Sequence, residues 1–205
     1  MPKISVVEFG IGNIYSVTNA FARVGCKPLI ARDGDELLKQ SPDKIVLPGV
    51  GAIGEAFSGL KNRGFVPVIN EMISDQKIHV LGICVGMQIM AETCEEFGLH
   101  QTLGWIPGRV RRIIPDVPSL HIPHVGWNNV TATTDDRLLK DVSGEHFYFT
   151  HSCAFECDEE YVIGRFEYGK SIICAVRLNN IYGVQFHPEK SSGKGEKVLA
   201  AFVNE

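Results

Sequence analysis

The first half of the chain alternates short apolar runs with segments of helical spacing, and this alternation restricts the fold more than any other feature. Apolar residues recur on one helical face over about 13–24, directly after the first apolar run. Alternation of this kind predicts βαβ units around a parallel sheet. The predicted buried strands are residues 3–9, 28–31, 43–49 and 79–83.

The second half changes character and is rich in strand-like stretches separated by turn residues. We expect these stretches to be antiparallel additions to the parallel sheet, followed by a last helix over about 195–203. Neither a linker nor a repeat divides the sequence, so we predict one domain over 1–205, with an α/β fold whose central, mostly parallel sheet is flanked by helices. The strand-like stretches are 104–113, 121–130, 145–152, 161–168, 171–178 and 180–186.

Composition excludes several classes of function. The 205 residues carry 20 basic against 24 acidic side chains, and the densest basic cluster is Arg109, Arg111 and Arg112, so we expect no nucleic-acid partner. The N-terminus lacks the pattern of a signal peptide and no run approaches about 18 apolar residues. We therefore expect a cytoplasmic protein without membrane contact.

The six cysteines are expected to be reduced thiols, because a cytosolic chain of this size seldom forms structural disulfides. Cys153 and Cys157 lie near His151, yet the remaining ligands of a tetrahedral metal site are not offered at a recognisable spacing. We expect neither a metal nor a cofactor.

The stretch HVLGICVGMQIM (79–90) places Cys84 between Gly82 and Gly86, where a predicted strand turns into a helix running to about Glu92. A nucleophile on such a tight turn is exposed at the carboxyl end of a sheet, and a helix N-terminus favours a thiolate. We predict that Cys84 is a nucleophile. Most buried cysteines act as small apolar residues, and we interpret four of the other five in that way: Cys26, Cys94, Cys157 and Cys174.

A cysteine nucleophile needs a base, and the base needs a group that orients it. His187 follows the strand-like run 180–186 and opens the sequence HPEKS. In an extended segment residues i and i+2 point the same way, so Glu189 is placed to bond one nitrogen of His187 while the other faces Cys84. Considered without Cys84 and Glu189, His187 would be interpreted as a surface residue at the end of a strand.

The strand-to-helix turn at Cys84, called a nucleophile elbow, and the His-Pro-Glu sequence together resemble the class I glutamine amidotransferases, whose triad is Cys, His and Glu. The finer pattern is similar to the glutaminase subunits of imidazole glycerol phosphate synthases, which serve histidine biosynthesis. This resemblance implies a flavodoxin-like fold and a heterodimer with a separate cyclase, which makes imidazole glycerol phosphate and AICAR. The stretches that carry it are FGIGN (9–13), LPGVGA (47–52), GICVGMQ (82–88), PHVGWN (123–128), FTHS (149–152) and GVQFHPEKS (183–191).

Amide hydrolysis develops negative charge on the carbonyl oxygen, so oriented N–H donors are required. One is expected from Val85, the residue after the nucleophile. The other is expected from PGVG, where Gly49 and Gly51 permit an unusual backbone, and the resemblance places the oxyanion strand at Gly49, Val50 and Gly51. The alternative interpretation of PGVG is a turn that ends the strand and has no catalytic role.

Gln88 lies one helical turn after Cys84 and is predicted to hold the α-amino or carboxylate group of glutamine. The resemblance implies that Glu96 and the backbone of His151, Ser152 and Cys153 complete the glutamine site. It also places Trp127, Asn128 and Lys190 at the contact with the cyclase. Relatives often carry tyrosine where this chain has Cys153 and leucine where it has Val85.

The sequence offers four other interpretations. FGIGN with Asp33 resembles a dinucleotide fingerprint, but Tyr15 occupies the third glycine position, and Asn13 reads better as a helix N-cap. Peptidase-like and deglycase elbow proteins carry histidine directly after the cysteine, where this chain has Val85. An inactive interaction subunit conflicts with the intact triad. A paralogous glutaminase that feeds another synthase, such as one modifying a nucleotide sugar, remains the alternative, since Glu8-Phe9 and Cys153 depart from the common pattern.

Overall fold

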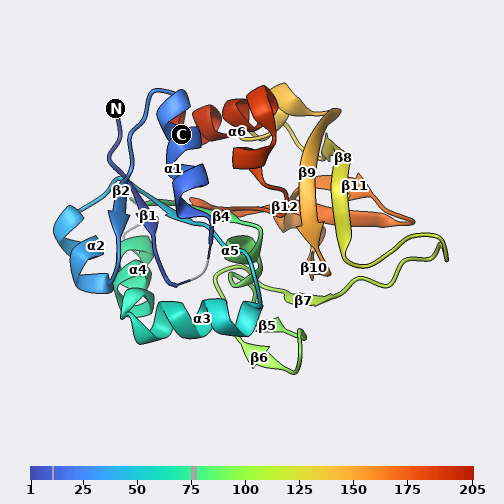
Figure 1. The fold of residues 1–205 in the computed structure, drawn as a ribbon, viewed down its shortest axis with the longest axis horizontal. Helices are drawn as coiled ribbons and strands as arrows, with labels where there is room; N and C mark the ends of the chain where they lie inside the picture. The colour runs from blue at the N-terminus through green and yellow to red at the C-terminus, as the bar shows by residue number, and fades with distance from the viewer. Residues whose placement is uncertain (11, 75–77) are drawn as a thin grey trace.

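A nine-stranded mixed sheet forms the centre of the molecule (Figure 1). The computed structural model describes residues 1–10, 12–74 and 78–205, so Ile11 of FGIGN lies outside the described residues. The first five strands in the sheet are parallel, and the remaining four are antiparallel. Their spatial order is β2 (Leu29–Ala31), β1 (Ile4–Val7), β3 (Lys44–Leu47), β4 (His79–Ile83), β13 (Ile181–Val184), β12 (Ser171–Leu178), β11 (Val162–Glu167), β8 (His124–Ala132) and β9 (Glu145–His151).

Helices cover both faces of the parallel half. In Figure 1, α1 (Ile14–Arg23) and α6 (Ser192–Asn204) lie above the sheet, while α3 (Ile53–Asn62) and α4 (Phe65–Ser74) lie below it and α2 (Gly34–Gln40) lies at its edge. The predicted helix after the first strand is confirmed. Asn13 caps it, with its side chain accepting a bond from Ser16 N at 3.3 Å. The α/β sheet predicted from the alternation is therefore present.

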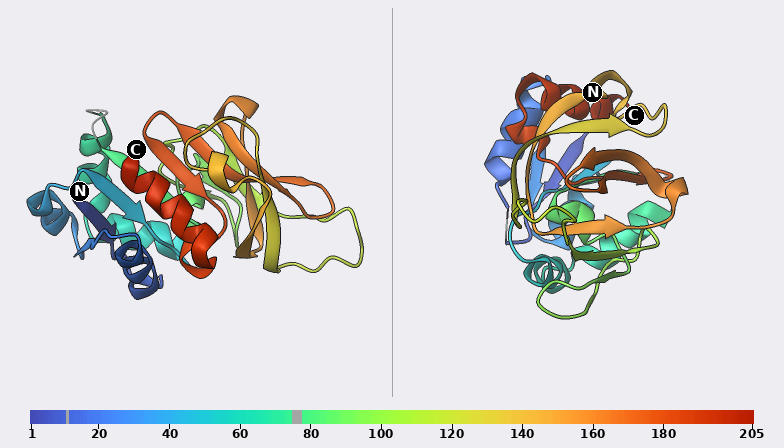
Figure 2. Two further views of the ribbon diagram at one scale, coloured as in Figure 1. Left: turned by 90° about the horizontal axis from the view of Figure 1, so that it is seen from above. Right: turned by 90° about the vertical axis from the view of Figure 1, so that its right-hand side faces the viewer.

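The second half corrects the sequence prediction in two places. The stretch 180–186 is not an antiparallel addition: its strand β13 pairs parallel with β4 and antiparallel only with β12. The stretch 104–113 contributes only β7 (Arg109–Arg112), which joins a second sheet with β10 (Cys153–Glu156), β5 (Thr93–Cys94) and β6 (His100–Gln101). The strands of this half curve around one end of the molecule (Figure 2).

The helix after Cys84 is shorter than predicted. It spans only α5 (Val85–Gln88), and turns replace it before Glu92. The backbone carbonyls of residues 89–92 accept hydrogen bonds from the N–H groups of residues 102–106, so they are not free to bond further along a helix. Tertiary pairing with a distant segment has overridden the local apolar spacing.

The two glycines around Cys84 serve close packing. A Cβ on Gly82 would lie 2.5 Å from Gly86 O, and one on Gly86 would lie 1.8 Å from Leu47 O. Neither glycine has a positive φ; the unusual backbone is at Cys84 itself. The glycines therefore allow α5 to pack closely against β3 and β4, and this packing places Cys84 at the edge of the sheet.

Replacing Gly86 by alanine is expected to destabilise the fold by about 1–3 kcal/mol or more, because the added methyl group overlaps a backbone carbonyl that cannot rotate away. Urea unfolding followed by circular dichroism measures the loss. Gly193→Ala is the matched control, since a Cβ at Gly193 in α6 meets nothing within 4 Å. Equal midpoints for the two variants would contradict the packing role.

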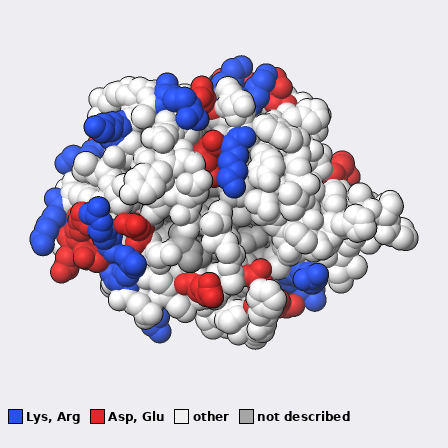
Figure 3. Space-filling view, viewed as in Figure 1, with Lys and Arg blue, Asp and Glu red and all other residues white. Residues whose placement is uncertain are grey.

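Surface charge on the face shown in Figure 3 is mixed, with basic and acidic side chains beside one another and a largely uncharged middle. Within the described ranges, none of the helices has the length and apolar character needed to cross a membrane.

Candidate active site

Three neighbouring parallel strands end at one edge of the sheet and bring the predicted residues together. β3 pairs with β4, with Leu47 opposite Gly82, and β4 pairs with β13, with Ile83 opposite Val184. The segments that follow these strands are PGVG, Cys84 and Gln185-Phe186-His187. Parallel strands point their carboxyl ends the same way, so residues distant in sequence meet at this edge.

Cys84 adopts a strained backbone at this edge, with φ 53° and ψ −109°. Such a conformation costs about 1–3 kcal/mol in a residue with a side chain and is characteristic of nucleophile elbows. The side chain is 3% exposed. Its sulfur lies 3.8 Å from Thr150 O, to which the thiol donates, and 3.5 Å from Gln185 Nε2, from which it accepts.

His187 and Glu189 form the predicted pair. Nδ1 of His187 lies 2.8 Å from Glu189 Oε1, and both side chains are almost fully buried. The predicted reason was wrong in one respect: Glu189 reaches the ring from a 3-10 turn over Pro188–Lys190, not from an extended segment. The short turn brings the carboxylate back to Nδ1 of the imidazole.

The environment of His187 favours its protonated form. Burial acts to lower its pKa, but the Cys84 sulfur, as a thiolate, on one side and the Glu189 carboxylate on the other raise it by more, to about 9. Nε2 of His187 has no hydrogen-bond partner among the described residues. The thiol and the imidazole are thus neighbours without a formed hydrogen bond, as is common before a substrate draws such groups together.

A cavity of about 210 Å³ opens beside Cys84. This is smaller than the ~300–1,000 Å³ of sites for drug-sized ligands, and it suits a single amino acid. His187 and Glu189 are not among the residues that line this cavity. The lining residues are Val50, Gly51, Cys84, Val85, Gln88, Glu96, Pro123, Thr150, His151, Ser152 and Cys153.

The predicted oxyanion donors border this cavity. Within the described residues, no protein acceptor bonds the backbone N–H groups of Val50, Gly51 or Val85. Gly51 has φ 102°, which only glycine adopts readily, whereas Gly49 is required for close packing, since a Cβ there would lie 2.8 Å from Val85 Cβ. Unpaired N–H groups beside a nucleophile are what a developing oxyanion requires.

Gln88 and Glu96 both reach the cavity, and both also have partners within the protein. Gln88 Nε2 donates to Cys153 O at 3.0 Å and to Gln185 Oε1 at 2.9 Å, so only its oxygen is open to a ligand. Glu96 Oε2 accepts from Ile53 N at 2.7 Å, at the start of α3. The second carboxylate oxygen of Glu96 supplies negative charge that suits an ammonium group.

Ser152 joins β9 of the large sheet to β10 of the second sheet, so the residues around it are held from two sides. Ser152 O accepts from Ile113 N at 2.9 Å, and Cys153 pairs with Arg112 across β7. Burial raises the pKa of the Cys153 thiol to about 12. Cys153 therefore shapes the cavity as a neutral side chain.

His151 forms a buried pair with His124, a residue that the sequence analysis did not select. His151 Nδ1 donates to Cys153 O at 2.8 Å, so its Nε2 accepts from His124 Nδ1 at 3.2 Å. Burial lowers the pKa of both rings to about 4. Both histidines are neutral at pH 7, in contrast to His187.

Acidification is expected to destabilise the protein between about pH 6.5 and pH 4. In that range the unfolded chain protonates His124 and His151 while the folded chain does not. Each histidine therefore lowers the free energy of unfolding by about 1.4 kcal/mol for each pH unit of acidification. His187 makes a contribution of opposite sign: its raised pKa stabilises the folded chain below pH 6.5, and this stabilisation is lost as the pH rises from 6.5 through about 9. Urea unfolding across pH 4.5–9 measures both limbs.

His124→Phe should flatten the acid limb of this profile, because phenylalanine keeps the stacking on Phe166 but does not protonate. The exposed His146, replaced by phenylalanine, is the matched control. An acid limb of unchanged slope in His124→Phe would contradict the assignment.

The predicted partner-interface residues lie next to the triad. Trp127 is 53% exposed and packs edge-on against Tyr148, at 6.1 Å between ring centroids. Lys190 Nζ lies 5.5 Å from the centre of the same Tyr148 ring, which is itself 6.4 Å from the His187 ring. Asn128 differs, since its Nδ2 donates to Glu167 O at 2.9 Å and so fixes the sheet.

The dinucleotide interpretation of FGIGN gains no support from the fold. Asp33 caps α2, with its carboxylate accepting from Glu36 N at 2.7 Å. Gly10 and Gly12 have φ values of 101° and 124°, as a tight turn between β1 and α1 requires.

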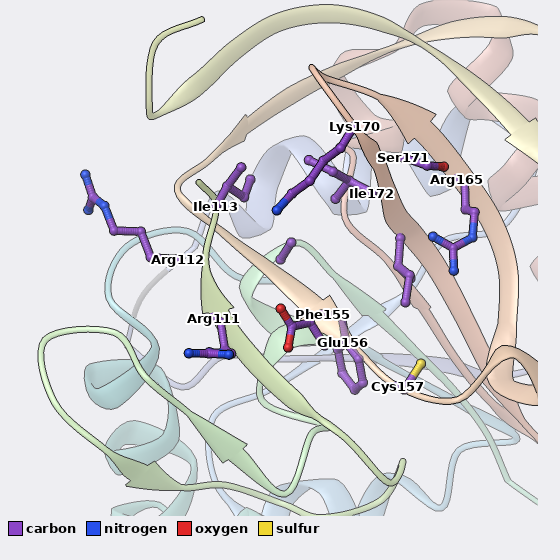
Figure 4. Close-up of a pocket in the computed structure, with 12 residues that line it drawn as sticks. Arg111, Arg112, Ile113, Phe155, Glu156, Cys157, Arg165, Lys170, Ser171 and Ile172 are labelled. Carbon is purple, nitrogen blue, oxygen red and sulfur yellow. The ribbon is translucent and has the colours of Figure 1, made fainter. Parts of the chain in front are cut away.

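A second cavity, of about 300 Å³, lies between β7, β10 and β12, outside the predicted site (Figure 4). Its floor is apolar, and Figure 4 shows Lys170 and Arg165 reaching toward it. Arg111 and Arg165 are already paired with Glu95 and Glu159. None of these residues contacts the triad.

Sequence reasoning missed Gln185, Thr150, Pro123, His124 and Tyr148 as site residues. Gln185 carried a usable signal, because it is a polar side chain inside an otherwise apolar strand run, and buried polar groups require partners. The others face the site through cross-strand packing that a single sequence does not reveal.

The fold, with Cys84 at a strand-to-helix turn and the His187–Glu189 pair after the neighbouring strand β13, defines a class I glutamine amidotransferase. The family model for "Glutamine amidotransferase class-I" matches residues 5–205. A solved glutamine amidotransferase has a TM-score of 0.77 at 16% identity over 98% of this chain and 97% of its own, and PurLQS from Thermotoga maritima has 0.74 at 18% over 99% and 98%. These structures support the fold.

Sequence relatives narrow the family. The imidazole glycerol phosphate synthase subunit HisH of Bdellovibrio bacteriovorus is 41% identical over 97% of this chain and 98% of its own. HisH of Sulfurimonas denitrificans is 42% identical over 98% of this chain and 97% of its own. The chain belongs to the HisH family of class I glutamine amidotransferases.

Proposed function

We propose that this chain, folded as one glutamine amidotransferase domain over 1–205, is the glutaminase subunit of an imidazole glycerol phosphate synthase in histidine biosynthesis. The observation that carries the proposal is the meeting of Cys84 with the His187–Glu189 pair beside a cavity sized for one amino acid. Three unpaired backbone donors border the same cavity.

The geometry supports a thioester mechanism. Cys84, as the thiolate whose proton is held by His187, attacks the side-chain amide carbon of glutamine, and the oxygen takes up negative charge beside the N–H groups of Val85 and the PGVG stretch. The intermediate collapses as His187, protonated at neutral pH, gives its proton to the leaving ammonia. Water then attacks the thioester and gives a proton to His187. The intermediate expels the Cys84 thiolate as glutamic acid forms and releases its proton to solvent, so the thiolate and the protonated His187 are restored.

The ammonia requires an acceptor protein, because free ammonia protonates in water and loses its nucleophilicity. We assign the exposed Trp127 and Lys190 to the contact with a cyclase partner in a cytoplasmic heterodimer. An aromatic anchor and an exposed cation suit a partner surface with a pocket and an acidic group. Asn128 acts in this contact by holding β8 in place.

Complementation tests the proposal. Expressed with its cognate cyclase, the chain should restore growth without histidine to cells that lack their own glutaminase subunit. The Cys84→Ala chain with the same cyclase is the control and should fail at low ammonium. Glutamine hydrolysis without restored growth would instead favour a paralogue that serves another synthase.

A further inference from the structure

A chain of hydrogen bonds leads from the backbone of Cys153 to the sulfur of Cys84. Gln88 Nε2 donates both to Cys153 O at 3.0 Å and to Gln185 Oε1 at 2.9 Å. Gln185 Nε2 then donates to Cys84 Sγ at 3.5 Å. Gln88 is 3% exposed and Gln185 is 0% exposed, so water does not compete for these groups.

The direction of the chain is fixed by its first member. A backbone carbonyl only accepts hydrogen bonds, so the Gln88 group that faces Cys153 O is its NH₂. The same NH₂ meets Gln185, so the Gln185 atom at that contact is its carbonyl oxygen. Gln185 must therefore turn its NH₂ toward Cys84, and the reverse orientation would set two donors against each other.

The backbone of Gln185 is also held. Its N–H donates to Cys174 O at 2.8 Å in the neighbouring strand, and the residue directly follows β13, which is paired on both sides. A side chain held at both its backbone and its amide has little freedom to move away from the sulfur. This is the rigidity that a preorganised donor requires.

An N–H donor aimed at sulfur stabilises a thiolate more than a neutral thiol or thioester. The other polar contact of the sulfur, Thr150 O, is an acceptor and favours the neutral thiol. The ionisable groups facing Cys84 are His187 from the segment after β13, with Glu189 behind it, and Glu96 and His151 across the cavity. Gln185 is thus the uncharged donor that acts on the nucleophile beside the cationic His187.

We propose that Gln185 is a further catalytic residue, which stabilises the attacking anionic form of Cys84, and that Gln88 is the positioning residue that keeps the Gln185 amide turned that way. This inference rests on the proposed glutaminase function and adds a fourth side chain to the triad. It also gives Gln88 a role that does not depend on contact with glutamine.

The experiment measures iodoacetamide alkylation of Cys84 from pH 6 to pH 9, with peptide mass spectrometry to separate it from the five other cysteines. Gln185→Met keeps the shape but removes the donor, so alkylation at pH 7 should slow about tenfold or more, and the pH midpoint of the rate should rise. Gln185→Glu places a negative charge beside the sulfur and should slow it further. Gln88→Met, which frees the Gln185 amide to turn over, should give a smaller effect in the same direction.

Gln40→Met is the matched control. Gln40 accepts from Ser5 Oγ at 2.6 Å and donates to Ile30 O at 2.8 Å, so both ends of its side-chain amide are held, as in Gln185, but neither partner is Cys84. Its alkylation profile should equal that of the wild type. In glutamine turnover with the partner present, Gln185→Met should lower kcat with little change in KM.

Identical alkylation profiles for the wild type and folded Gln185→Met would overturn the inference. If Gln185→Met does not fold, Gln88→Met, which leaves Gln185 in place but removes the bond that orients its amide, supplies the test, and an alkylation profile equal to that of the wild type would overturn the inference. The proposed function has its own failure: glutamine turnover that survives complete alkylation of Cys84 in the wild type would remove the nucleophile, whatever the Gln185 variants do.

Discussion

Cys84→Ala is expected to abolish glutamine-dependent synthesis by the complex while synthesis from added ammonium salts continues at the wild-type rate. The covalent step depends on one sulfur, and loss of a nucleophile in such a triad typically lowers kcat by about 10⁴-fold or more. The strained backbone of Cys84 shows that the fold places this one side chain at some cost. The measurement is product formation with glutamine and, separately, with ammonium chloride.

His187→Ala should behave in the same way, whereas Glu189→Gln should be milder, because an amide oxygen still accepts the bond from His187 Nδ1. Cys174→Ala is the matched control, since Cys174 is a free, fully buried thiol in β12. Glutamine turnover near the wild-type rate in Cys84→Ala would refute the assignment of the nucleophile.

Glutamate release is expected to rise about 10²–10³-fold from the isolated chain to the complex with its acceptor ligand bound, with the unliganded complex in between. This factor is what one oxyanion donor is worth. We expect the PGVG stretch to present its N–H only when the partner's acceptor site is filled. The unpaired donors of Val50 and Gly51 are consistent with a backbone that has no internal bond to break.

Trp127→Ala and Lys190→Ala should each weaken binding of the partner and reduce this stimulation. Two exposed side chains on α2, Leu38 and Lys39, replaced by alanine, are the matched controls for loss of an apolar and a cationic surface group. Equal rates of glutamate release by the isolated chain, the unliganded complex and the complex with acceptor ligand would contradict the proposed activation by the partner. Normal binding and stimulation in Trp127→Ala would remove that residue from the interface.

The first four strands of the parallel half were predictable because each is a short, mainly apolar run bounded by turn residues. The position of β13 was not, because an apolar strand beside β4 satisfies the same pattern in either direction. The length of α5 was also hidden: nothing near Ile89 shows that its carbonyl accepts from Leu103 N. Local spacing decides element type, and distant backbone pairing decides where elements end.

The residues of the candidate site likewise fall into those that the sequence predicts and those that it does not. Cys84, His187 and Glu189 were predictable since each carries reactive chemistry beside a glycine or proline signal. His124 and Gln185 act through partners that are distant in sequence, at His151 and Cys84. Glu189 shows that a correct contact can follow from incorrect local geometry, because the 3-10 turn and an extended segment both bring it to the imidazole.

The place of β13 between β4 and β12 has a consequence for how the protein acquires its reactivity during synthesis. Cys84 leaves the ribosome long before Gln185, which is 101 residues further along the chain. Contacts of such separation form late, so Cys84 spends the early part of folding without His187 and Gln185 beside it. We therefore expect the thiol of Cys84 to be less reactive in a partly synthesised chain, and to gain its reactivity when β13 inserts beside β4.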